Sequence, residues 1–543
     1  MASNLVSWRE FFSDEKMHSR EARRNDPAFW TAVSSNGVVT TVNYRATAAG
    51  AEILSNGGNA VDAAAAAAFA LGVVDPASSG LGGMAMMLIH LSNNNKTVVL
   101  DGACPAPLNA SPKVVAASLR YSGYRAVAVP TNVAVLNYAL QHYGRLSRSE
   151  ILAPAISFAE EGYPLTAHHL RITKTYQKQL ARNTGASFFL DADLNPFPES
   201  TVFRQPVLAK TLRRLEQEGF EDFYTGEIAR CIVEDMEKNG GFLCVKDLKD
   251  VPWPTVTDPL VGTFSDMTVH TLPHPGGGLV LLEMLHLFDE LMPAGFDPNS
   301  PEAAVLIAGI IKRVRRDRRR YRLAGGVGVD ESNFPDLASR EYAKQAALEV
   351  LDDLKIDGET THLCVMDRDL NVVSMTQSIE RSFGAKVVTS NLGFLYNGYM
   401  RTFKVKNKKH PFYLRPGARA RSNAAPSILF KGKEPRIAVG STGSERLASG
   451  VFQVLVRLQS QTPFESVSAP RLHCTPEGDV HLEAERFSAS TVAMLEGHGF
   501  RIHPLEAWSF KAGGLQLAVY DGKAFTGVGE PRRDGAAAGP ICS

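Results

Sequence analysis

The hydrophobic pattern of this 543-residue chain is clearest between positions 360 and 378. An apolar run at 363–366 shows little polar alternation, a mainly polar segment interrupts it at 367–371, and a second run leads to Ser378. This pattern predicts a β-hairpin whose first strand is buried on both faces. If its turn centres on Asp369, positions equally far from Asp369 pair with each other, so Thr360 faces Ser378. Directly opposed residues have Cβ atoms about 4.5–5.5 Å apart, so two hydroxyl groups meet at the start of a strand.

Helical and strand patterns alternate along the rest of the chain, without low-complexity linkers or internal repeats. Asn59 is a predicted N-cap, with Asp62 three positions later, for an alanine-rich helix that ends near Gly72. Further patterns predict strands at 86–91, 97–101 and 436–439, and helices within 133–163, 206–240 and 447–458.

Thr360 has special chemistry only if the Glu359–Thr360 bond is cut and Thr360 becomes a new N-terminus. A bare hydroxyl is a poor nucleophile at neutral pH, but a free α-amine with a pKa of about 8 on the same residue can act as its base. A threonine pair also opens many ordinary strands. The hairpin alone therefore leaves a catalytic and a structural interpretation open.

A glycine-rich segment at 440–446 joins the predicted strand 436–439 to the predicted helix 447–458. Such a turn into a helix presents unpaired backbone N–H groups and the positive end of the helix dipole. Donors of this kind, aimed at a developing oxyanion, lower a reaction barrier by about 3–4 kcal/mol each. An ordinary helix cap is the alternative. The glycines at 80–83 lack the Lys-Ser/Thr of a phosphate-binding P-loop.

Composition and charge limit the function classes. The formal net charge is +1, which favours neither nucleic acid nor an anionic membrane as a partner, and the 44% hydrophobic content suffices for a large core. The first 24 residues lack the apolar segment of a secretory signal, and the apolar stretch 63–74 is too short to span a bilayer. We therefore expect a cytoplasmic protein with reduced cysteines and a small-molecule substrate, and with no metal or cofactor.

Residues 312–322 carry eight basic side chains. An anion- or nucleic-acid-binding surface and a solvated helix face both have this composition. Because aromatic side chains do not alternate with the basic ones, we favour the solvated helix face.

Several distant segments together resemble the γ-glutamyltransferase family of N-terminal-nucleophile (Ntn) hydrolases. They occur in the order typical of the family and extend over about residues 36–540, nearly the whole chain. The matching segments are 57–64, 74–76, 78–83, 275–279 with 282–285, the hairpin start 360–362, and 440–443, 469–471 and 530–535.

The resemblance implies an α+β fold, the αββα four-layer sandwich of Ntn hydrolases, formed from both pieces of a self-cleaved precursor. Cleavage between Glu359 and Thr360 divides the chain into a large piece, 1–359, and a small piece, 360–543, which stay associated as one folded unit. Thr360 is then the nucleophile and Ser378 orients it. The oxyanion donors of the family map onto the amides of Gly443 and Ser444, where serine replaces a usual glycine.

Substrate recognition is where this chain departs from relatives that use glutathione. The arginine that binds the glutamyl α-carboxylate in those relatives is replaced by Ala103, and the aspartate that pairs with the α-amine is replaced by Thr402. Arg401 occupies the preceding acidic position. Because an α-amino acid needs one cationic and one anionic partner, a normal glutathione site is not expected.

Three more positions differ from the glutamyl-binding pattern. Ser378 stands for a threonine, Glu380 for an asparagine, and Ser422-Asn423 for a serine pair. Arginines at 401, 415, 419 and 421 suit a carboxylate-bearing acyl group. The alternative is that these arginines are surface residues or pair with Glu380 and Glu445.

Three functions remain open from the sequence. The first is an autoprocessed amide or acyl hydrolase with a small non-glutamyl substrate. The second is a conventional glutathione hydrolase and γ-glutamyltransferase that uses substituted contacts. The third is a non-catalytic pseudoenzyme. Three atypical residues are consistent with it: Leu370 in place of a turn glycine, Glu380 and Ser444.

Overall fold

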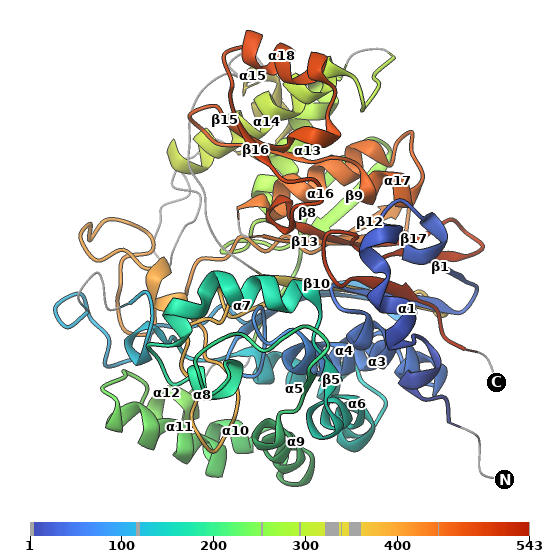
Figure 1. The fold of residues 1–543 in the computed structure, drawn as a ribbon. Helices are drawn as coiled ribbons and strands as arrows, with labels where there is room; N and C mark the ends of the chain where they lie inside the picture. Colours follow the sequence, from blue (N-terminus) through green and yellow to red (C-terminus); the bar gives the residue numbers. More distant parts are fainter. Residues whose placement is uncertain are drawn as a thin grey trace.

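The structure is a computed structural model that describes residues 5–115, 120–250, 254–292, 295–320, 336–337, 339–346, 360–443 and 445–541. Within these residues, helices and β-sheets build the mixed α+β fold that the sequence predicts (Figure 1). Across the same ranges, every helix is too short or too polar to span a lipid bilayer.

The predicted hairpin lies at the centre of one antiparallel sheet, here called the hairpin sheet. In spatial order, its strands in the described residues are β19 (Ala536–Ala538), β2 (Gly37–Thr41), β10 (Thr361–Asp367), β11 (Val372–Ser378), β3 (Met84–Leu91), β4 (Lys96–Asp101) and β7 (Thr255–Thr257). The N-terminal strands β2 and β3 therefore flank the hairpin, and the C-terminal strand β19 lies beyond β2.

A second antiparallel sheet faces the first. In spatial order, its described strands are β1 (Thr31–Ser34), β18 (Phe525–Val528), β17 (Gly514–Tyr520), β13 (Glu434–Thr442), β12 (Ser427–Lys431), β9 (Met267–Thr271) and β8 (Leu260–Phe264). The N-terminal strand β1, blue in Figure 1, lies beside the red C-terminal strands. Two small sheets contain β5 (Tyr163–Pro164) with β6 (Val202–Phe203), and β14 (Leu472–Cys474) with β15 (Asp479–Glu483) and β16 (Arg501–Leu505).

Helices cover the outer faces of the two sheets (Figure 1). The first part of the chain forms α1 (Asp14–His18), α2 (Pro27–Trp30), α3 (Tyr44–Ser55), α4 (Ala60–Val74), α5 (Asn132–Tyr143), α6 (Arg148–Glu161), α7 (Ala167–Leu180), α8 (Ala186–Phe189), α9 (Pro206–Glu218), α10 (Asp222–Thr225), α11 (Glu227–Lys238) and α12 (Val245–Lys249). The later part forms α13 (Gly278–Leu291), α14 (Pro301–Arg320), α15 (Arg340–Ala346), α16 (Arg446–Arg457), α17 (Pro463–Ser468) and α18 (Ala489–Gly497).

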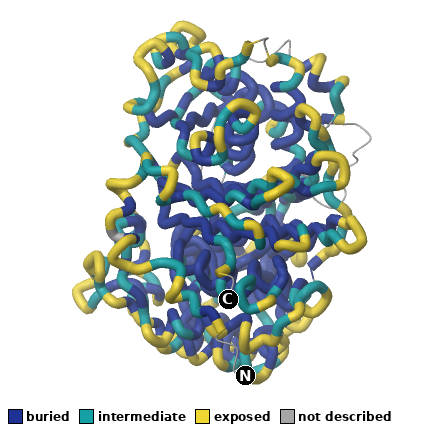
Figure 2. Tube along the Cα trace, turned by 90° about the vertical axis from the view of Figure 1, so that its right-hand side faces the viewer, coloured by how far each residue is buried: buried dark blue, intermediate teal, exposed yellow. Residues whose placement is uncertain are grey.

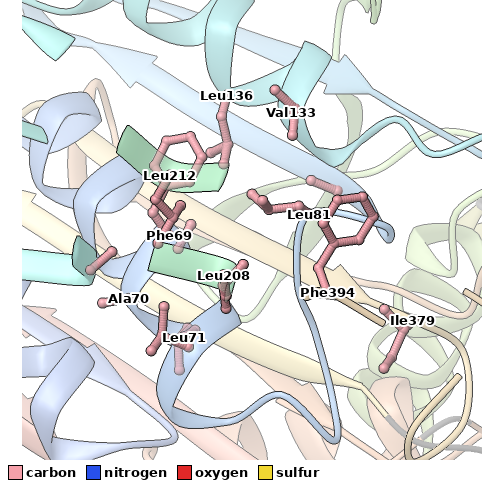
Figure 3. Close-up of a cluster of buried hydrophobic side chains, with 14 of the residues drawn as sticks. Phe69, Ala70, Leu71, Leu81, Val133, Leu136, Leu208, Leu212, Ile379 and Phe394 are labelled. Carbon is pink, nitrogen blue, oxygen red and sulfur yellow. The ribbon is translucent and has the colours of Figure 1, made fainter. Parts of the chain in front are cut away.

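The strands of the hairpin are buried on both faces, and alternate residues serve two different cores. Leu363 and Val365 pack with helices α3–α6 and α9 in a large cluster, part of which Figure 3 shows around Phe69. Cys364 and Met366 point to the other face and pack between the two sheets. A third cluster fills the space between the second sheet and helices α13, α14 and α16. The buried residues accordingly run through the middle of the molecule (Figure 2).

The register of the hairpin agrees with the sequence prediction. Thr361 pairs with Gln377 and His362 with Thr376, so the turn centres on Asp369. Leu370, which stands where the family usually has glycine, adopts φ +63°, a left-handed conformation that favours glycine. The Asp367 carboxylate accepts hydrogen bonds from the backbone N–H groups of Asp369 and Asn371 and thereby helps to hold this turn.

The helix predictions were confirmed with small shifts of their ends. Asn59 caps α4 and forms a capping box with Asp62, but the helix continues to Val74. The periodic region 133–163 is two helices, α5 and α6, because the chain leaves the helical conformation at Gly144. The region 206–240 likewise contains α9, α10 and α11.

Candidate active site

A cavity of about 200 Å³ lies where β10 begins and β11 ends. It brings together seven of the residues that the sequence predicts for the site, from segments up to 63 positions apart: Thr360, Ser378, Glu380, Arg401, Thr402, Ser422 and Asn423. It is also lined by Met84, Arg120, Tyr121, Thr376, Tyr399, Lys404, Arg421 and Ala424. These seven residues therefore share one cavity.

Thr360 lies directly before β10, and the register of the hairpin places it opposite Ser378. Both residues are buried, with 8% of Thr360 and 2% of Ser378 exposed, and both line the cavity. On its other side, Ser378 pairs with Met84 of β3. The backbone of Ser378 is thus held between two strands, opposite the position of Thr360.

Ser378 also organises the segment that follows β11. Its Oγ accepts a hydrogen bond of 2.8 Å from the backbone N–H of Glu380, and its side chain is hydrogen-bonded to Tyr399. Glu380 adopts φ +84°, a conformation that non-glycine residues rarely adopt and that asparagine tolerates better than glutamate. Backbone strain of this kind costs about 1–3 kcal/mol and clusters at functional sites.

The side chain of Glu380 forms an ion pair with Arg401 on the cavity wall. Arg401 Nη1 lies 3.1 Å from Glu380 Oε1, and the two side chains are 17% and 12% exposed. Burial raises the pKa of the Glu380 carboxyl, while the Arg401 charge opposes that rise. Arg401 belongs to a short 3-10 helix, η7 (Tyr399–Thr402), in which Thr402 Oγ1 donates to the carbonyl of Tyr399.

The basic run at 312–322 is not a solvated helix face, so that prediction was wrong for the described part of the run. Lys312, Arg313 and Arg315 are buried within α14. Arg315 pairs with Glu445, and Arg318 donates to the side chain of Asn423 and the carbonyl of Ser422. Burial lowers the pKa of Arg318 to about 9, and the nearby charge of Arg421 adds to the effect. The periodicity missed these contacts because they depend on tertiary packing.

Glycine is needed at position 440 for a reason that the sequence did not suggest. Gly440 belongs to β13, which continues to Thr442, so the predicted turn 440–446 is shorter than expected. A Cβ at Gly440 would lie 2.2–2.6 Å from ring atoms of His362. His362 is fully buried, its Nδ1 lies 2.9 Å from Thr376 Oγ1, and burial lowers its pKa to about 3. Neutral His362 therefore fills the space between the sheets directly behind the cavity wall.

The structure describes one of the two predicted oxyanion donors, Gly443, but not the other, Ser444. Gly443 is buried in the turn between β13 and α16 at φ +103°, and it is not among the residues that line the cavity. Ser444 and the cleavage-site residue Glu359 lie outside the described residues. Glu445, at the start of α16, lies 3.8 Å from Arg421 of the cavity wall. The turn therefore adjoins the cavity through this ion pair.

Ala103 does not line the cavity that contains Thr360. It lines a separate cavity of about 310 Å³, where Arg419 forms an ion pair with Asp101. Of the three arginines at 415, 419 and 421, only Arg421 lines the Thr360 cavity. Ala103 is nevertheless in the same buried cluster as Met84 and Tyr399, so it lies behind the cavity wall.

Sequence reasoning missed Arg120, Tyr121 and Lys404. Arg120 and Tyr121 come from a segment without periodicity or a recognisable motif, so no local signal marked them. Lys404 lies two positions after Thr402, and this spacing was the available signal.

Comparison with known proteins agrees with this geometry. A model of the Gamma-glutamyltranspeptidase family matches residues 46–540. The chain belongs to this family. It is therefore an enzyme of the Ntn-hydrolase class, and a non-catalytic role is not retained.

Relatives of this γ-glutamyltranspeptidase-family enzyme cover nearly its whole length. It is 31% identical to the glutathione hydrolase proenzyme of Pseudomonas aeruginosa, over 95% of this chain and 96% of the relative. It is 28% identical to the glutathione hydrolase proenzyme of Bacillus subtilis, over 93% of this chain and 92% of the relative. The crystal structure of cephalosporin acylase from Bacillus halodurans superimposes with a TM-score of 0.85 at 27% identity, covering 94% of this chain and 97% of that one.

Proposed function

We propose that this enzyme cuts its own chain before Thr360 and then uses Thr360 as an N-terminal nucleophile. The observation that carries the proposal is the position of Thr360, which lies directly before β10, opposite Ser378 in the register, and lines the cavity. The pieces are residues 1–359 and 360–543. They stay associated because both pieces contribute strands to each of the two large sheets.

The proposed fold is the αββα sandwich of Ntn hydrolases. Three clusters of buried side chains support it, one between the sheets and one between each sheet and its helices. The hairpin sheet anchors the strand that follows the new N-terminus, because β10 is paired on both sides by β2 and β11.

The proposed reaction is acyl transfer through a threonine ester. Thr360 Oγ attacks the carbonyl carbon of the substrate, its proton passes to the α-amine of Thr360, and the amides of Gly443 and Ser444 stabilise the tetrahedral oxyanion. The protonated amine then donates to the leaving amine as the carbon–nitrogen bond breaks. Water or an acceptor amine attacks the ester and releases the acyl group. Ser378 orients Thr360 by a hydrogen bond.

We propose a small carboxylate-bearing acyl group without a glutamyl α-amine as the substrate. Four basic residues, Arg120, Arg401, Lys404 and Arg421, line the cavity, against one acidic residue, Glu380, among the described residues. A cavity with an excess of cations favours an anion, and arginine matches the planar carboxylate. The similarity to a cephalosporin acylase supports hydrolysis of a non-glutamyl amide.

A conventional glutathione hydrolase is the second candidate, and Glu380 is the observation in its favour. The Glu380 carboxylate lines the cavity and is a possible partner for an α-ammonium group, and relatives with this activity cover most of the chain. Its pairing with Arg401 reduces that capacity. Release of glutamate from glutathione at rates comparable to those of the relatives would favour this candidate.

Intact-mass measurement of purified protein tests the nucleophile. Wild type should yield two fragments, with the smaller one starting at Thr360, whereas Thr360→Ala should remain a single 58.9 kDa chain. Thr360→Ser retains a hydroxyl and should still be cut. An uncut wild-type chain that hydrolyses amides would show that another residue is the nucleophile.

A further inference from the structure

Thr376 brings to the Thr360 cavity a hydroxyl group to which the proposed reaction assigns no role. It is 1% exposed, lines the cavity, and lies two positions before Ser378 on β11. Because side chains alternate along a strand and opposed residues share a face, Thr376 lies on the face of the hairpin that also holds Thr360, His362 and Ser378. Thr376 is therefore the diagonal neighbour of Thr360 on this face.

His362, which faces Thr376 across the hairpin, has different surroundings at its two ring nitrogens. Nδ1 lies 2.9 Å from Thr376 Oγ1, whereas Nε2 lies 3.4 Å from Ser374 Oγ and 3.3 Å from Cys364 Sγ. Ser374 Oγ and Cys364 Sγ each donate to a backbone carbonyl of the second sheet. Because both neighbours of Nε2 direct their hydrogens elsewhere, Nε2 is the donor in these contacts and carries the hydrogen of the ring.

This tautomer fixes the hydrogen of the Thr376 hydroxyl group. Burial lowers the pKa of His362 to about 3, so the ring is neutral and carries one hydrogen. With that hydrogen on Nε2, Nδ1 has a lone pair, and Thr376 Oγ1 donates to it. Contact with Gly440 limits movement of the ring, since a Cβ at that position would lie 2.2–2.6 Å from ring atoms. Thr376 Oγ1 therefore presents only lone pairs to the cavity.

We infer that Thr376 Oγ1 accepts a hydrogen bond from the α-amine of mature Thr360, and that His362 is the positioning residue that keeps Thr376 an acceptor. When the amine takes the proton of Thr360 Oγ it becomes an ammonium group, and an acceptor stabilises this charged form more than the neutral amine. Thr376 and His362 gain and lose no proton in this step. The inference rests on the proposed function, because the α-amine exists only after the bond before Thr360 is cut.

The pH dependence of kcat/KM for glutaryl-p-nitroanilide, whose short acyl group carries a carboxylate, tests the inference. The value of kcat/KM should rise with pH as the α-amine loses its proton and becomes the base. Thr376→Val has the same shape without the acceptor, so the pKa of the amine should fall. This rise of kcat/KM should then move to lower pH by about one pH unit. Thr376→Ser retains the oxygen and should keep the wild-type profile.

The direction of the shift distinguishes an acceptor from a donor. A Thr376 hydroxyl that donated to the amine would stabilise its neutral form, so its removal would raise the pKa and move the rise of kcat/KM to higher pH. The other titratable groups that line the cavity are unchanged in every variant. The charged ones are Arg120, Glu380, Arg401, Lys404 and Arg421, and the tyrosines are Tyr121 and Tyr399.

Thr40→Val is the matched control for Thr376→Val. Thr40 is fully buried, pairs with Cys364 on the same face of the hairpin sheet, and does not line the cavity, so the pH profile should not change. His362→Leu removes the acceptor of the Thr376 hydrogen and should shift the profile in the same direction as Thr376→Val. In the Thr376→Val background it should cause no further shift, because His362 acts through Thr376.

The outcomes separate this inference from the proposed function. Intact-mass measurement should show that Thr376→Val is cut at Thr360, because the amine does not exist before the cut. A profile that does not move in Thr376→Val, or that moves to higher pH, would overturn the inference and leave the nucleophile intact. An uncut Thr376→Val chain would also overturn it, by showing that Thr376 acts before the amine forms. A wild-type chain that stays uncut and does not hydrolyse the anilide would overturn the proposed function itself.

Discussion

Arg401 Nη1 lies 3.1 Å from Glu380 Oε1 on the wall of the cavity that contains Thr360. The sequence left two roles open for Arg401, binding of a substrate carboxylate and pairing with a nearby acid. The structure favours pairing, because both side chains are largely buried and lie within ion-pair distance of each other. Arg401 is thus part of the wall and a poor candidate for the substrate's anion.

A double-mutant cycle should measure this pair. Arg401→Met removes the ion-pair partner of Glu380, although the charges of Arg381 and Lys386 still act on its carboxyl. The substitution should lower the free energy of unfolding by roughly 3 kcal/mol, a typical cost of breaking a buried ion pair. Glu380→Gln combined with Arg401→Met removes both charges and should recover a large part of that loss. Urea denaturation of the two single variants and the double variant gives the coupling energy. Additive losses would show that the two side chains do not stabilise each other.

Ser378→Ala should slow both maturation and turnover while leaving the fold intact. The variant loses the hydroxyl group opposite Thr360 and the acceptor for the Glu380 N–H. We expect a reduction of about 10–100-fold, as for the loss of one hydrogen bond worth roughly 1–3 kcal/mol in the transition state. The rate of fragment formation and the kcat for an amide substrate are the measurements.

Ser374→Ala is the matched control for Ser378→Ala. Ser374 is on the same face of β11 but faces Cys364, four residue pairs further from Thr360, and it donates to the carbonyl of Val439. Its loss should lower stability without changing the maturation rate comparably. Equal effects of the two variants on maturation would mean that Ser378 acts only through the fold.

The hairpin and the location of the site could be predicted from the sequence because they depend on local patterns. The apolar run beginning after Thr361 and the turn at Asp369 set the register, and the register brings Thr360 to Ser378. Glu380 follows closely in the chain, so its place near the site was also predictable. The helix cap at Asn59 is similarly local.

The features that were missed depend on residues far apart in the chain. Arg120 reaches the carbonyl of Phe403 over 283 positions, and Arg315 reaches Glu445 over 130. A run of arginines looks the same in a sequence whether its charges face water or buried acids. The role of Gly440 was also hidden, because it depends on the ring of His362 in a neighbouring sheet.

Glu283 should make stability depend on pH. It is fully buried between α13 and α14, and burial, followed by the nearby charge of Asp317, raises its pKa well above the usual range, with Arg313 opposing the rise. Arg313 also pairs with Asp317 and donates to Tyr342, so these groups surround the carboxyl. The folded state therefore keeps Glu283 protonated, whereas the unfolded chain ionises it above about pH 4.3.

The direction of the pH dependence follows from this difference in protonation between the folded and unfolded states. The contribution of Glu283 to stability is complete below its unfolded pKa and falls as pH rises towards its folded pKa, by up to about 1.4 kcal/mol per pH unit. Glu283→Gln does not titrate, so it should be more stable than wild type at pH 7 and similar to it near pH 4. Urea denaturation at both pH values is the measurement. A variant that is less stable at pH 7 would show that Glu283 is ionised in the folded protein.

Thr402→Asp should move the specificity of the enzyme towards γ-glutamyl compounds. Wild type should hydrolyse γ-glutamyl-p-nitroanilide poorly, because Glu380, the acid on the cavity wall, is paired with Arg401 and the α-ammonium group meets several cations. Thr402 lines the same cavity, so an aspartate there adds an anionic partner for the α-amine. The kcat/KM ratio of the γ-glutamyl to the glutaryl anilide should rise about ten-fold or more, as expected for one charge-assisted hydrogen bond. Thr402→Asn, with a similar shape and no charge, should leave the ratio near the wild-type value, and efficient wild-type cleavage of the γ-glutamyl anilide would favour the glutathione hydrolase candidate instead.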